Sequence, residues 1–397
     1  MKILVISQYF YPEDFRINDI CKGLKEKGHE VEILTGLPNY PEGKLYKGYS
    51  IFNKGPKKYE NMKIYRTLMV TRGKDSSIRL GLNYLSFMIL GSFKALTLLN
   101  KKYDRVFVFQ VSPITSAIPA LIIKKFKKVK SYIYIQDLWP ETFYSIINVK
   151  NKHIRRFLKK ICIKIYNGFD YLLLASKGYE DILVKNIDRK KFIYFPQWAE
   201  DFYGQDLKEH KKEKNKKFNV TFAGNIGKAQ SVETIIKAAS ICENEDIIWN
   251  IIGDGSEFEK IKAMVKEKSL ENKVILHGRR PSSDMPKYFS MSDGLIVTLK
   301  NEEILKVTLP AKVQSYMAAG KPIIGALSGE GNRIIKESKC GFSCEAEDYK
   351  GLCENVVKLY NMSDNERENI GKRGKSFFEN NFSRKKLLNE LDKFLKT

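Results

Sequence analysis

Lys312 is the residue of this chain whose position best suits the binding of an anion. In 308–322, apolar Val313, Tyr316 and Met317 recur at helical spacing, so a loop is expected to run into a short helix that begins near the lysine. The N-terminus of a helix offers unpaired amides and the positive end of a dipole, which suit a diphosphate, and the lysine adds a full charge. The alternative is a loop whose lysine is merely solvated, and the segment alone favours neither interpretation over the other.

Two further groups in the C-terminal half follow strand-like runs. Gly224 and Gly227 would let the backbone approach a ligand closely, and Lys228 could add charge where the next helix meets a phosphate. Such a turn can equally serve packing alone. Arg279 and Arg280 follow a later strand, where a guanidinium fork suits diphosphate oxygens, although one of the two is expected to be only solvated.

In the N-terminal half, polar side chains follow a strand-like run that ends at Gln136. Asp137 and Glu141 could orient the hydroxyl groups of a ligand, whereas Gln136 has no titratable proton and is excluded from proton transfer. The alternative for Asp137 is to cap the following helix, and its position allows both roles.

Two loops of the same half combine aromatic rings with carboxylate or amide groups. One holds Tyr11 and Glu13 after the first strand, and the other, residues 35–43, holds Asn39. Aromatic rings pack on the apolar faces of sugars while polar groups meet their hydroxyls, so both loops are candidates for saccharide binding. The first loop lacks the glycines of a dinucleotide-binding fingerprint.

Strand-like runs alternate with helical stretches along the whole chain, which predicts parallel sheets built from βαβ units. The runs of the first half are Lys2–Ser7, Glu30–Thr35, Lys63–Thr67, Arg105–Gln110, Ser131–Gln136, Tyr171–Ala175 and Phe192–Phe195. Those of the second half are Asn219–Ala223, Ile247–Ile252, Val274–His277, Gly294–Thr298 and Pro322–Ala326. The predicted fold class is α/β, with two doubly wound Rossmann-like domains that face a central cleft.

Changes in composition predict the domain boundaries. Residues 1–200 should form an N-terminal domain, the charged stretch 201–217 a linker, and residues 218–375 a C-terminal domain. Residues 376–397 contain a closing helix at Leu387–Leu395.

The net charge of +24 is unevenly distributed, because residues 1–200 carry +19 and residues 201–397 carry +5. A docking surface for an anionic partner is therefore expected in the first half. Lys152–Tyr166 predicts a basic amphipathic helix, which either lies on anionic lipid or packs its apolar stripe on the sheet. Ile78–Leu99 is apolar but contains basic residues, so a buried or interfacial helix is expected rather than a membrane span.

The six cysteines show neither a disulfide framework nor zinc-ligand spacing, which favours buried thiols in a cytoplasmic protein. The first residues are too short and too strand-like for a signal peptide. No Asp-x-Asp pair follows a strand, so no metal site is expected.

The segment around Lys312 resembles the donor-phosphate helix of glycosyltransferase family 4. Met317–Pro322 matches the end of the family's Ala-Met-Ala-x-Gly-x-Pro motif, and Leu309–Lys312 is similar to the branch that transfers amino sugars in O-antigen and capsule assembly. The two glutamates of the wider family are replaced by Val307 and Ser315. The resemblance covers essentially the whole chain and implies the GT-B fold, whose last helix crosses back to the N-terminal domain.

The resemblance adds residues to the candidate site. Gly253 and Asp254 match a strand-end turn beside the nucleotide base, although a sharp turn explains these residues nearly as well, and Glu330 stands in a loop that helps to hold the donor. Together, the residues and the resemblance assign nucleotide-sugar binding to Gly224, Asn225, Gly227, Lys228, Gly253, Asp254, Arg279, Arg280, Leu309, Ser315 and Glu330. They assign catalysis to Lys312, Asp137 and Glu141, and acceptor binding to Tyr11, Glu13, Asn39 and Gln136.

The resemblance implies a retaining glycosyltransferase that moves a sugar, expected to be an N-acetylated amino sugar such as N-acetyl-fucosamine, from a UDP-sugar. The implied acceptor is a lipid-linked, undecaprenyl-type saccharide of O-antigen, capsule or exopolysaccharide synthesis. The enzyme would need no cofactor or metal, would bind no nucleic acid, and would lie in the cytoplasm on the anionic inner face of the cell membrane. Two alternatives are a UDP-sugar 2-epimerase of the same layout and, because of the charge, a non-enzymatic nucleic-acid-binding protein.

Overall fold

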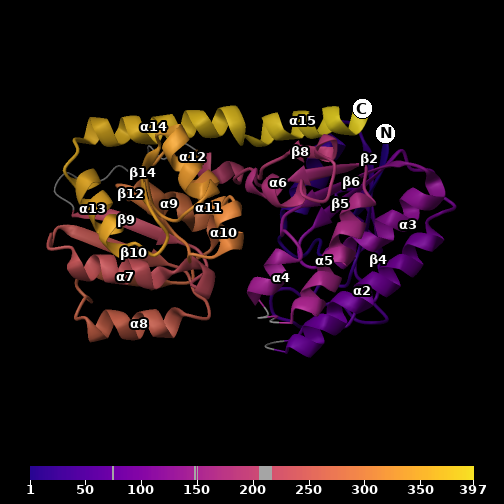
Figure 1. The fold of residues 1–397 in the computed structure, drawn as a ribbon, viewed down its shortest axis with the longest axis horizontal. Coiled ribbons are helices and arrows are strands. Elements are labelled where there is room, and N and C mark those ends of the chain that lie inside the picture. The colour runs from indigo at the N-terminus through magenta and orange to yellow at the C-terminus, as the bar shows by residue number, and fades with distance from the viewer. Residues whose placement is uncertain (74–75, 147–148, 150, 205–216) are drawn as a thin grey trace. The chain divides into compact units, whose positions relative to one another are not determined.

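The computed structural model divides into two compact units, each with its own sheet and with helices on both faces of that sheet (Figure 1). It describes residues 1–73, 76–146, 149, 151–204 and 217–397. The first unit comprises Met1–Ala175, Tyr179–Phe195 and Leu388–Thr397, and the second comprises Ser176–Gly178 and Pro196–Leu387. Most of the predicted linker, residues 205–216, lies outside the described part of the chain.

The first unit contains an eight-stranded sheet in the order β3-β4-β2-β1-β5-β6-β7-β8, parallel except for the β3–β4 pair. Its strands are β1 (Lys2–Ile6), β2 (Glu30–Thr35), β3 (Lys58–Tyr59), β4 (Met62–Arg66), β5 (Arg105–Gln110), β6 (Lys130–Ile135), β7 (Tyr171–Leu174) and β8 (Phe192–Tyr194). Its helices are α1 (Arg16–Glu26), α2 (Ser77–Thr97), α3 (Ile118–Lys127), α4 (Glu141–Ile146), α5 (Lys152–Asn167), α6 (Gly178–Leu183), the 3₁₀ turns η1 (Ile114–Ala117) and η2 (Arg189–Lys191), and most of α15 (Arg384–Lys396).

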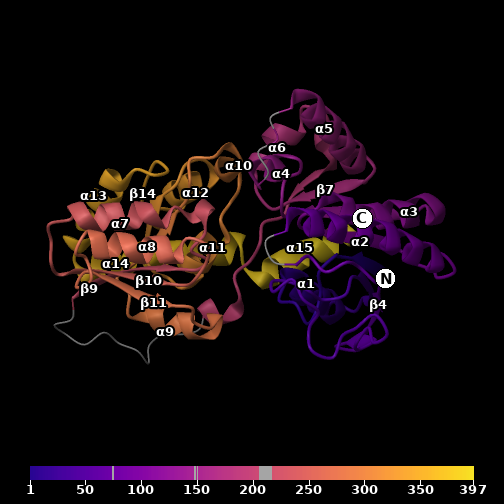
Figure 2. The ribbon, with the colours of Figure 1, turned by 90° about the horizontal axis from the view of Figure 1, so that it is seen from below.

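The helices of the first unit form two layers. From β1 to β2 the chain moves toward the β3 edge of the sheet, and from β4 through β7 it moves toward the β8 edge. Because crossovers between parallel strands are right-handed, α1 lies on one face of the sheet and α2, α3 and α5 lie on the other. The end of α15 lies beside α1 (Figure 2), where His29 Nε2 is 2.7 Å from Asp392 Oδ1 and the Tyr132 hydroxyl donates to the Phe394 carbonyl.

The second unit contains a six-stranded parallel sheet in the order β11-β10-β9-β12-β13-β14. Its strands are β9 (Phe218–Ala223), β10 (Ile247–Ile252), β11 (Val274–Gly278), β12 (Gly294–Thr298), β13 (Ile323–Ala326) and β14 (Gly341–Cys344). Its helices are α7 (Val232–Ile241), α8 (Phe258–Glu267), α9 (Met285–Ser290), α10 (Glu303–Val307), α11 (Ala311–Ala318), α12 (Glu330–Ser338), α13 (Tyr349–Tyr360) and α14 (Asp364–Asn381), with 3₁₀ turns η3 (Asp201–Gly204), η5 (Lys228–Gln230) and η6 (Ser282–Asp284). Apolar clusters fill both faces of this sheet, as doubly wound folds require.

The predicted fold class is confirmed, and each predicted strand forms within one residue of its expected ends. Two strands were missed because neither shows a strand-like pattern: β3 has two residues, and β14 reads Gly-Phe-Ser-Cys. The cysteines are free thiols, as expected. Among the described residues, no helix is both long and apolar enough to span a bilayer.

Candidate functional site

Lys312 lies in the first turn of α11 with its ammonium group buried under the end of β9. Its Nζ is 3.6 Å from the centre of the Phe222 ring and has no hydrogen-bond partner among the described residues. Although the residue as a whole is partly exposed, the atom that carries the charge, Nζ, is buried. Burial lowers the pKa of Lys312 to about 7, because the charged form loses hydration without gaining an anion.

Tyr316 fixes the position of that lysine. It follows Lys312 by four residues and therefore lies on the same face of α11. Its hydroxyl accepts from the Ala223 amide at 3.1 Å and lies 3.3 Å from the Ala223 carbonyl oxygen, so α11 is pinned to the last residue of β9.

Gly224 must be a glycine for the lysine to reach this position. A Cβ atom there would lie 2.5 Å from Lys312 Cε and 2.8 Å from Lys312 Nζ, and φ is +138°. The lysine thus passes directly beneath the turn in which backbone approach to a ligand was predicted.

The turns after β9 and β10 interlock at the carboxyl ends of their strands. The Gly224 amide donates to Ile252 O, and the Ile226 amide donates to Asp254 O, both at 2.9 Å. A Cβ on Gly253 would lie 1.8 Å from Gly224 O, so the turns could not meet with a side chain there. The structure therefore brings Gly224, Asn225, Gly227, Gly253 and Asp254 together in two interlocked turns, and Gly224 lies against Lys312.

The other predicted cations of this unit are exposed. Lys228, Arg279 and Arg280 follow β9 and β11 at the same edge of the sheet, with side chains that face solvent. Asp254 is also exposed, and its carboxylate accepts from the Gly255 amide at 2.7 Å, which shapes the turn. Lys312 differs from these cations in having its charged atom buried.

Three predicted donor residues lie on or beside α11 and α12. Leu309 is buried just before α11, and Ser315 is partly exposed within it. Glu330 is buried at the start of α12, where both of its carboxylate oxygens accept from Arg333 at 2.8 and 2.9 Å. Pro310 packs close to Gly331, so the starts of the two helices are neighbours.

In the first unit, Asp137 joins the loops after β5 and β6. Its carboxylate accepts from the amide of Ser112 at 2.9 Å and from the hydroxyl at 2.7 Å, and the Trp139 indole donates to the same hydroxyl at 3.1 Å. Burial raises the pKa of Asp137, while the Ser112 bonds oppose that shift. These bonds run to Ser112 and not to the first amides of α4, so the capping alternative is wrong.

Glu13 is buried between the two aromatic loops. One carboxylate oxygen accepts from the amides of Asn39 and Tyr40 at 2.7 and 2.8 Å, and the other accepts from the amide of Phe10 at 3.2 Å. Burial raises the pKa of Glu13 to about 7, against the effect of these backbone bonds. Asn39 is itself fully buried, and its side-chain oxygen accepts from the Arg72 amide at 2.9 Å.

The remaining predicted acceptor residues differ in exposure. Tyr11 is exposed and stacks on Tyr59 with ring centres 4.5 Å apart. Gln136 is buried, and its backbone oxygen accepts from the Tyr179 hydroxyl at 2.9 Å. Glu141 is the first residue of α4, and burial raises its pKa.

Residues 205–377 match the family model for glycosyl transferases group 1. The chain is a glycosyltransferase with a group 1 domain. It is 24% identical over 285 residues to "Probable glycosyltransferase WbjE" of Pseudomonas aeruginosa, which covers 67% of this chain and 69% of that protein. It is 23% identical to "Putative colanic acid biosynthesis glycosyl transferase WcaI" of Escherichia coli K12, over 81% of this chain and 82% of that protein.

Solved structures support the same fold for the glycosyltransferase. Alr3699/HepE of Anabaena, crystallised in complex with UDP, superposes over the whole of both chains with a TM-score of 0.72 and 13% sequence identity. Sucrose-phosphate synthase of Thermosynechococcus elongatus also gives 0.72, at 12% identity, over 100% of this chain and 98% of that chain. The fold is GT-B, as the resemblance of the sequence implied.

Sequence reasoning missed the residues that position the predicted groups of this glycosyltransferase. Phe222 contacts the Lys312 ammonium, Tyr316 ties α11 to Ala223, and Ser112 holds Asp137. The four-residue spacing from Lys312 to Tyr316 was the one available signal, because it places both on one helix face. Phe222 precedes Gly224 by two residues, but its ring contact with α11 is a tertiary contact with no local pattern.

Proposed function

We propose that this glycosyltransferase uses a UDP-sugar and binds the donor diphosphate at the start of α11, beneath the β9 turn. The observation that carries the proposal is the buried Lys312 ammonium, which has no anionic partner among the described residues. A diphosphate would supply the missing counter-charge, assisted by the free amides of the α11 N-terminus. Alr3699/HepE, which has the same fold, was crystallised with UDP and with UDP-glucose.

The chemical role of Lys312 would be to stabilise the departing UDP. As the glycosidic bond breaks, negative charge develops on the diphosphate, and a fixed cation in a dehydrated site stabilises that charge most strongly. A bound diphosphate would also raise the pKa of Lys312 above 7, so donor binding near neutral pH should be accompanied by proton uptake. No metal ion or other cofactor has a part in this step. The family resemblance further implies retention of anomeric configuration.

The proposed sugar is an N-acetylated amino sugar such as N-acetyl-fucosamine, and the proposed acceptor is a lipid-linked, undecaprenyl-type saccharide at the inner membrane face. The Leu309–Lys312 motif supports the amino sugar, and the name of WcaI as a colanic acid biosynthesis enzyme supports a surface polysaccharide. Tyr11, Asp137 and Glu141 would meet acceptor hydroxyls at the carboxyl ends of the first sheet.

A panel of UDP-sugars offered with lipid-linked acceptors tests this proposal. Mass spectrometry should detect a glycosylated lipid with at least one UDP-N-acetylamino sugar, and NMR of the product should show the anomeric configuration of the donor. Transfer that proceeds only from a different nucleotide, or release of an epimerised UDP-sugar without acceptor, would contradict it. Chelation with EDTA should leave the rate unchanged.

A further inference from the structure

The outer layer of the first unit, formed by α2, α3 and α5, exposes an unusual amount of apolar surface. On α2, large apolar side chains recur every three or four residues along one exposed stripe, at Ile78, Leu82, Leu85, Ile89, Phe93 and Leu96. Phe93 is 63% exposed and Ile78 is 79% exposed. Phe126 on α3 and Phe157 on α5 are exposed as well. Contiguous apolar surface of this kind marks an interaction site.

The same three helices carry positive charge without any acidic residue. They hold two basic residues on α2, three on α3 and six on α5, eleven in all, and no Asp or Glu. The opposite layer, α1 with α15, is mixed, with eight basic and four acidic residues, and none of its large apolar side chains is exposed. The apolar stripe and the unbalanced charge therefore belong to one face of one sheet.

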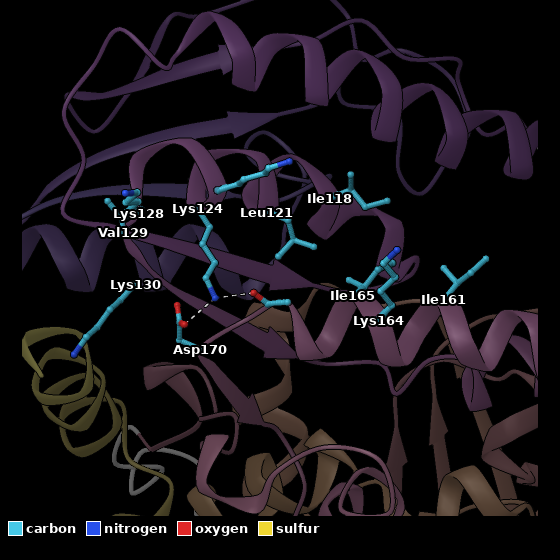
Figure 3. A pocket seen from close by; sticks show the side chains of 12 residues that line it. Ile118, Leu121, Lys124, Lys128, Val129, Lys130, Ile161, Lys164, Ile165 and Asp170 are labelled. Carbon is cyan, nitrogen blue, oxygen red and sulfur yellow. Dashed lines mark hydrogen bonds and ion pairs between the residues drawn. The ribbon is translucent and has the colours of Figure 1, made fainter.

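A pocket of about 760 Å³ opens between α3 and α5 on this layer (Figure 3). Its apolar wall comes from Ile118, Leu121, Val129, Ile161 and Ile165. Lys124 is neutralised, because its ammonium donates to Asp170 at 2.7 Å and to the Gly168 carbonyl at 2.8 Å. Lys125, Lys128 and Lys164 line the pocket with no anionic partner among the described residues. An apolar wall rimmed by free ammonium groups suits a phosphate that carries a hydrocarbon chain.

We propose that the α2–α3–α5 layer docks on an anionic lipid bilayer, with the α2 stripe among the acyl chains and the α3–α5 pocket around a lipid phosphate. Apolar residues flanked by lysines and arginines are the signature of helices that lie in the membrane interface. A second copy of this chain is a poor occupant, because two such layers would bring like charges together.

Docking of α2 would also place the candidate acceptor loops at the membrane surface. The buried face of α2 holds those loops: Asn83 accepts from Gln8 Nε2 at 2.8 Å and donates to Asn39 Oδ1 at 3.3 Å, and Ser86 Oγ accepts from the Val70 amide at 2.9 Å. The opposite face of the same helix is the exposed stripe. This link rests on the proposed function, whereas docking itself rests on exposure and charge alone.

Sedimentation with vesicles tests the docking surface. Wild-type protein should bind vesicles that contain phosphatidylglycerol and should bind pure phosphatidylcholine weakly. The variant Lys125→Gln/Lys128→Gln/Lys164→Gln should bind roughly a hundredfold more weakly, since each basic residue near the surface contributes about a factor of five. The matched control Lys262→Gln/Lys266→Gln/Lys268→Gln removes the same charge from α8 and the residue that follows it, and should bind like wild type.

The apolar stripe has its own variant, Leu82→Asn/Phe93→Asn, which should weaken vesicle binding at least tenfold. The control Ile241→Asn/Ile275→Asn changes exposed apolar residues of the second unit. Circular dichroism spectra and melting temperatures like those of wild type should show that all four variants fold, and retained UDP binding separates this test from the donor site of the second unit. Vesicle binding unchanged in the stripe variant would overturn the proposal, as would a wild-type dimer that the stripe variant converts to monomer.

Discussion

The charged side chains at the carboxyl ends of the two sheets have opposite signs. In the second unit, the buried Lys312 ammonium lies beneath a glycine turn, and exposed arginines follow β11 at the same edge of the sheet. In the first unit, the carboxylates of the buried Glu13 and the partly buried Asp137 accept hydrogen bonds from backbone amides and a serine. Two doubly wound units of similar topology thus present different chemistry, because the ligand is selected by the loops and not by the sheet. The first suits a neutral, hydroxyl-rich ligand and the second an anion.

The largest effect is expected from removal of the buried cation. Lys312→Met should lower kcat with a UDP-sugar about a hundredfold, because one preorganised charge that stabilises a leaving group is worth that much. The variant should melt like wild type or higher, since the ammonium is buried without a partner. Steady-state kinetics measure the change in kcat, and circular dichroism checks that the variant is folded. Unchanged turnover would remove Lys312 from the site.

A smaller but still large effect is expected from the turn above it. Gly224→Ala would place a methyl group 2.5 Å from Lys312 Cε at a φ of +138°, so the lysine or the turn must move. Turnover should fall at least tenfold. Gly81→Ala is the matched control, because nothing lies within 4 Å of its added Cβ. Equal rates for both alanine variants would show that the turn does not position the lysine.

On the other side of the comparison, Asp137→Asn should act on the acceptor alone. The amide oxygen can keep both bonds from Ser112, while the negative charge is lost. We expect the KM for the acceptor to rise about tenfold, the usual value of a hydrogen bond to a charged group. The Kd for UDP, measured by calorimetry, should stay within twofold. Weakened UDP binding would break the division of roles between the units.

The two buried charges should also give stability opposite dependences on pH. The pKa of Lys312 is about 7 in the folded state against 10.5 in the unfolded chain, so the unfolded state binds more protons in that window and the free energy of unfolding rises with pH. The pKa of Glu13 is about 7 against 4.5, so the free energy of unfolding falls as pH rises from 4.5 to 7.

Each slope should disappear in one variant and persist in the other. Lys312→Met should flatten the dependence above pH 7, and Glu13→Gln should flatten the dependence below it. Melting temperatures across pH 4.5–10.5 measure both pH dependences. The difference between each variant and wild type gives the contribution of the substituted residue, because the other titrating residues are the same in both proteins. Curves parallel to wild type in both windows would show that neither group carries the shifted pKa.

The sequence predicted the sheets well because apolar runs bounded by turns are local patterns. Lys312 could be found in the same way, since it precedes a helical repeat that ends in glycine and proline. The partners of the site residues could not be predicted. Glu13 meets amides 26 and 27 residues away, and Lys312 meets a ring 90 residues away, contacts that arise when separate turns fold together. The apolar helix at Ile78–Leu99 was expected to be either buried in the protein or interfacial. The sequence alone does not distinguish the two, because a helix buried in protein and one exposed to lipid have similar compositions.

Calorimetry of UDP binding in EDTA at pH 8, in two buffers of different ionisation enthalpy, tests the central claim most directly. The lysine should be largely neutral in the free protein at that pH, so wild type should bind UDP without metal and take up close to one proton. Lys312→Met should bind more weakly and take up none. Binding that requires a divalent cation, or proton uptake that persists in the variant, would contradict a diphosphate site built on this lysine.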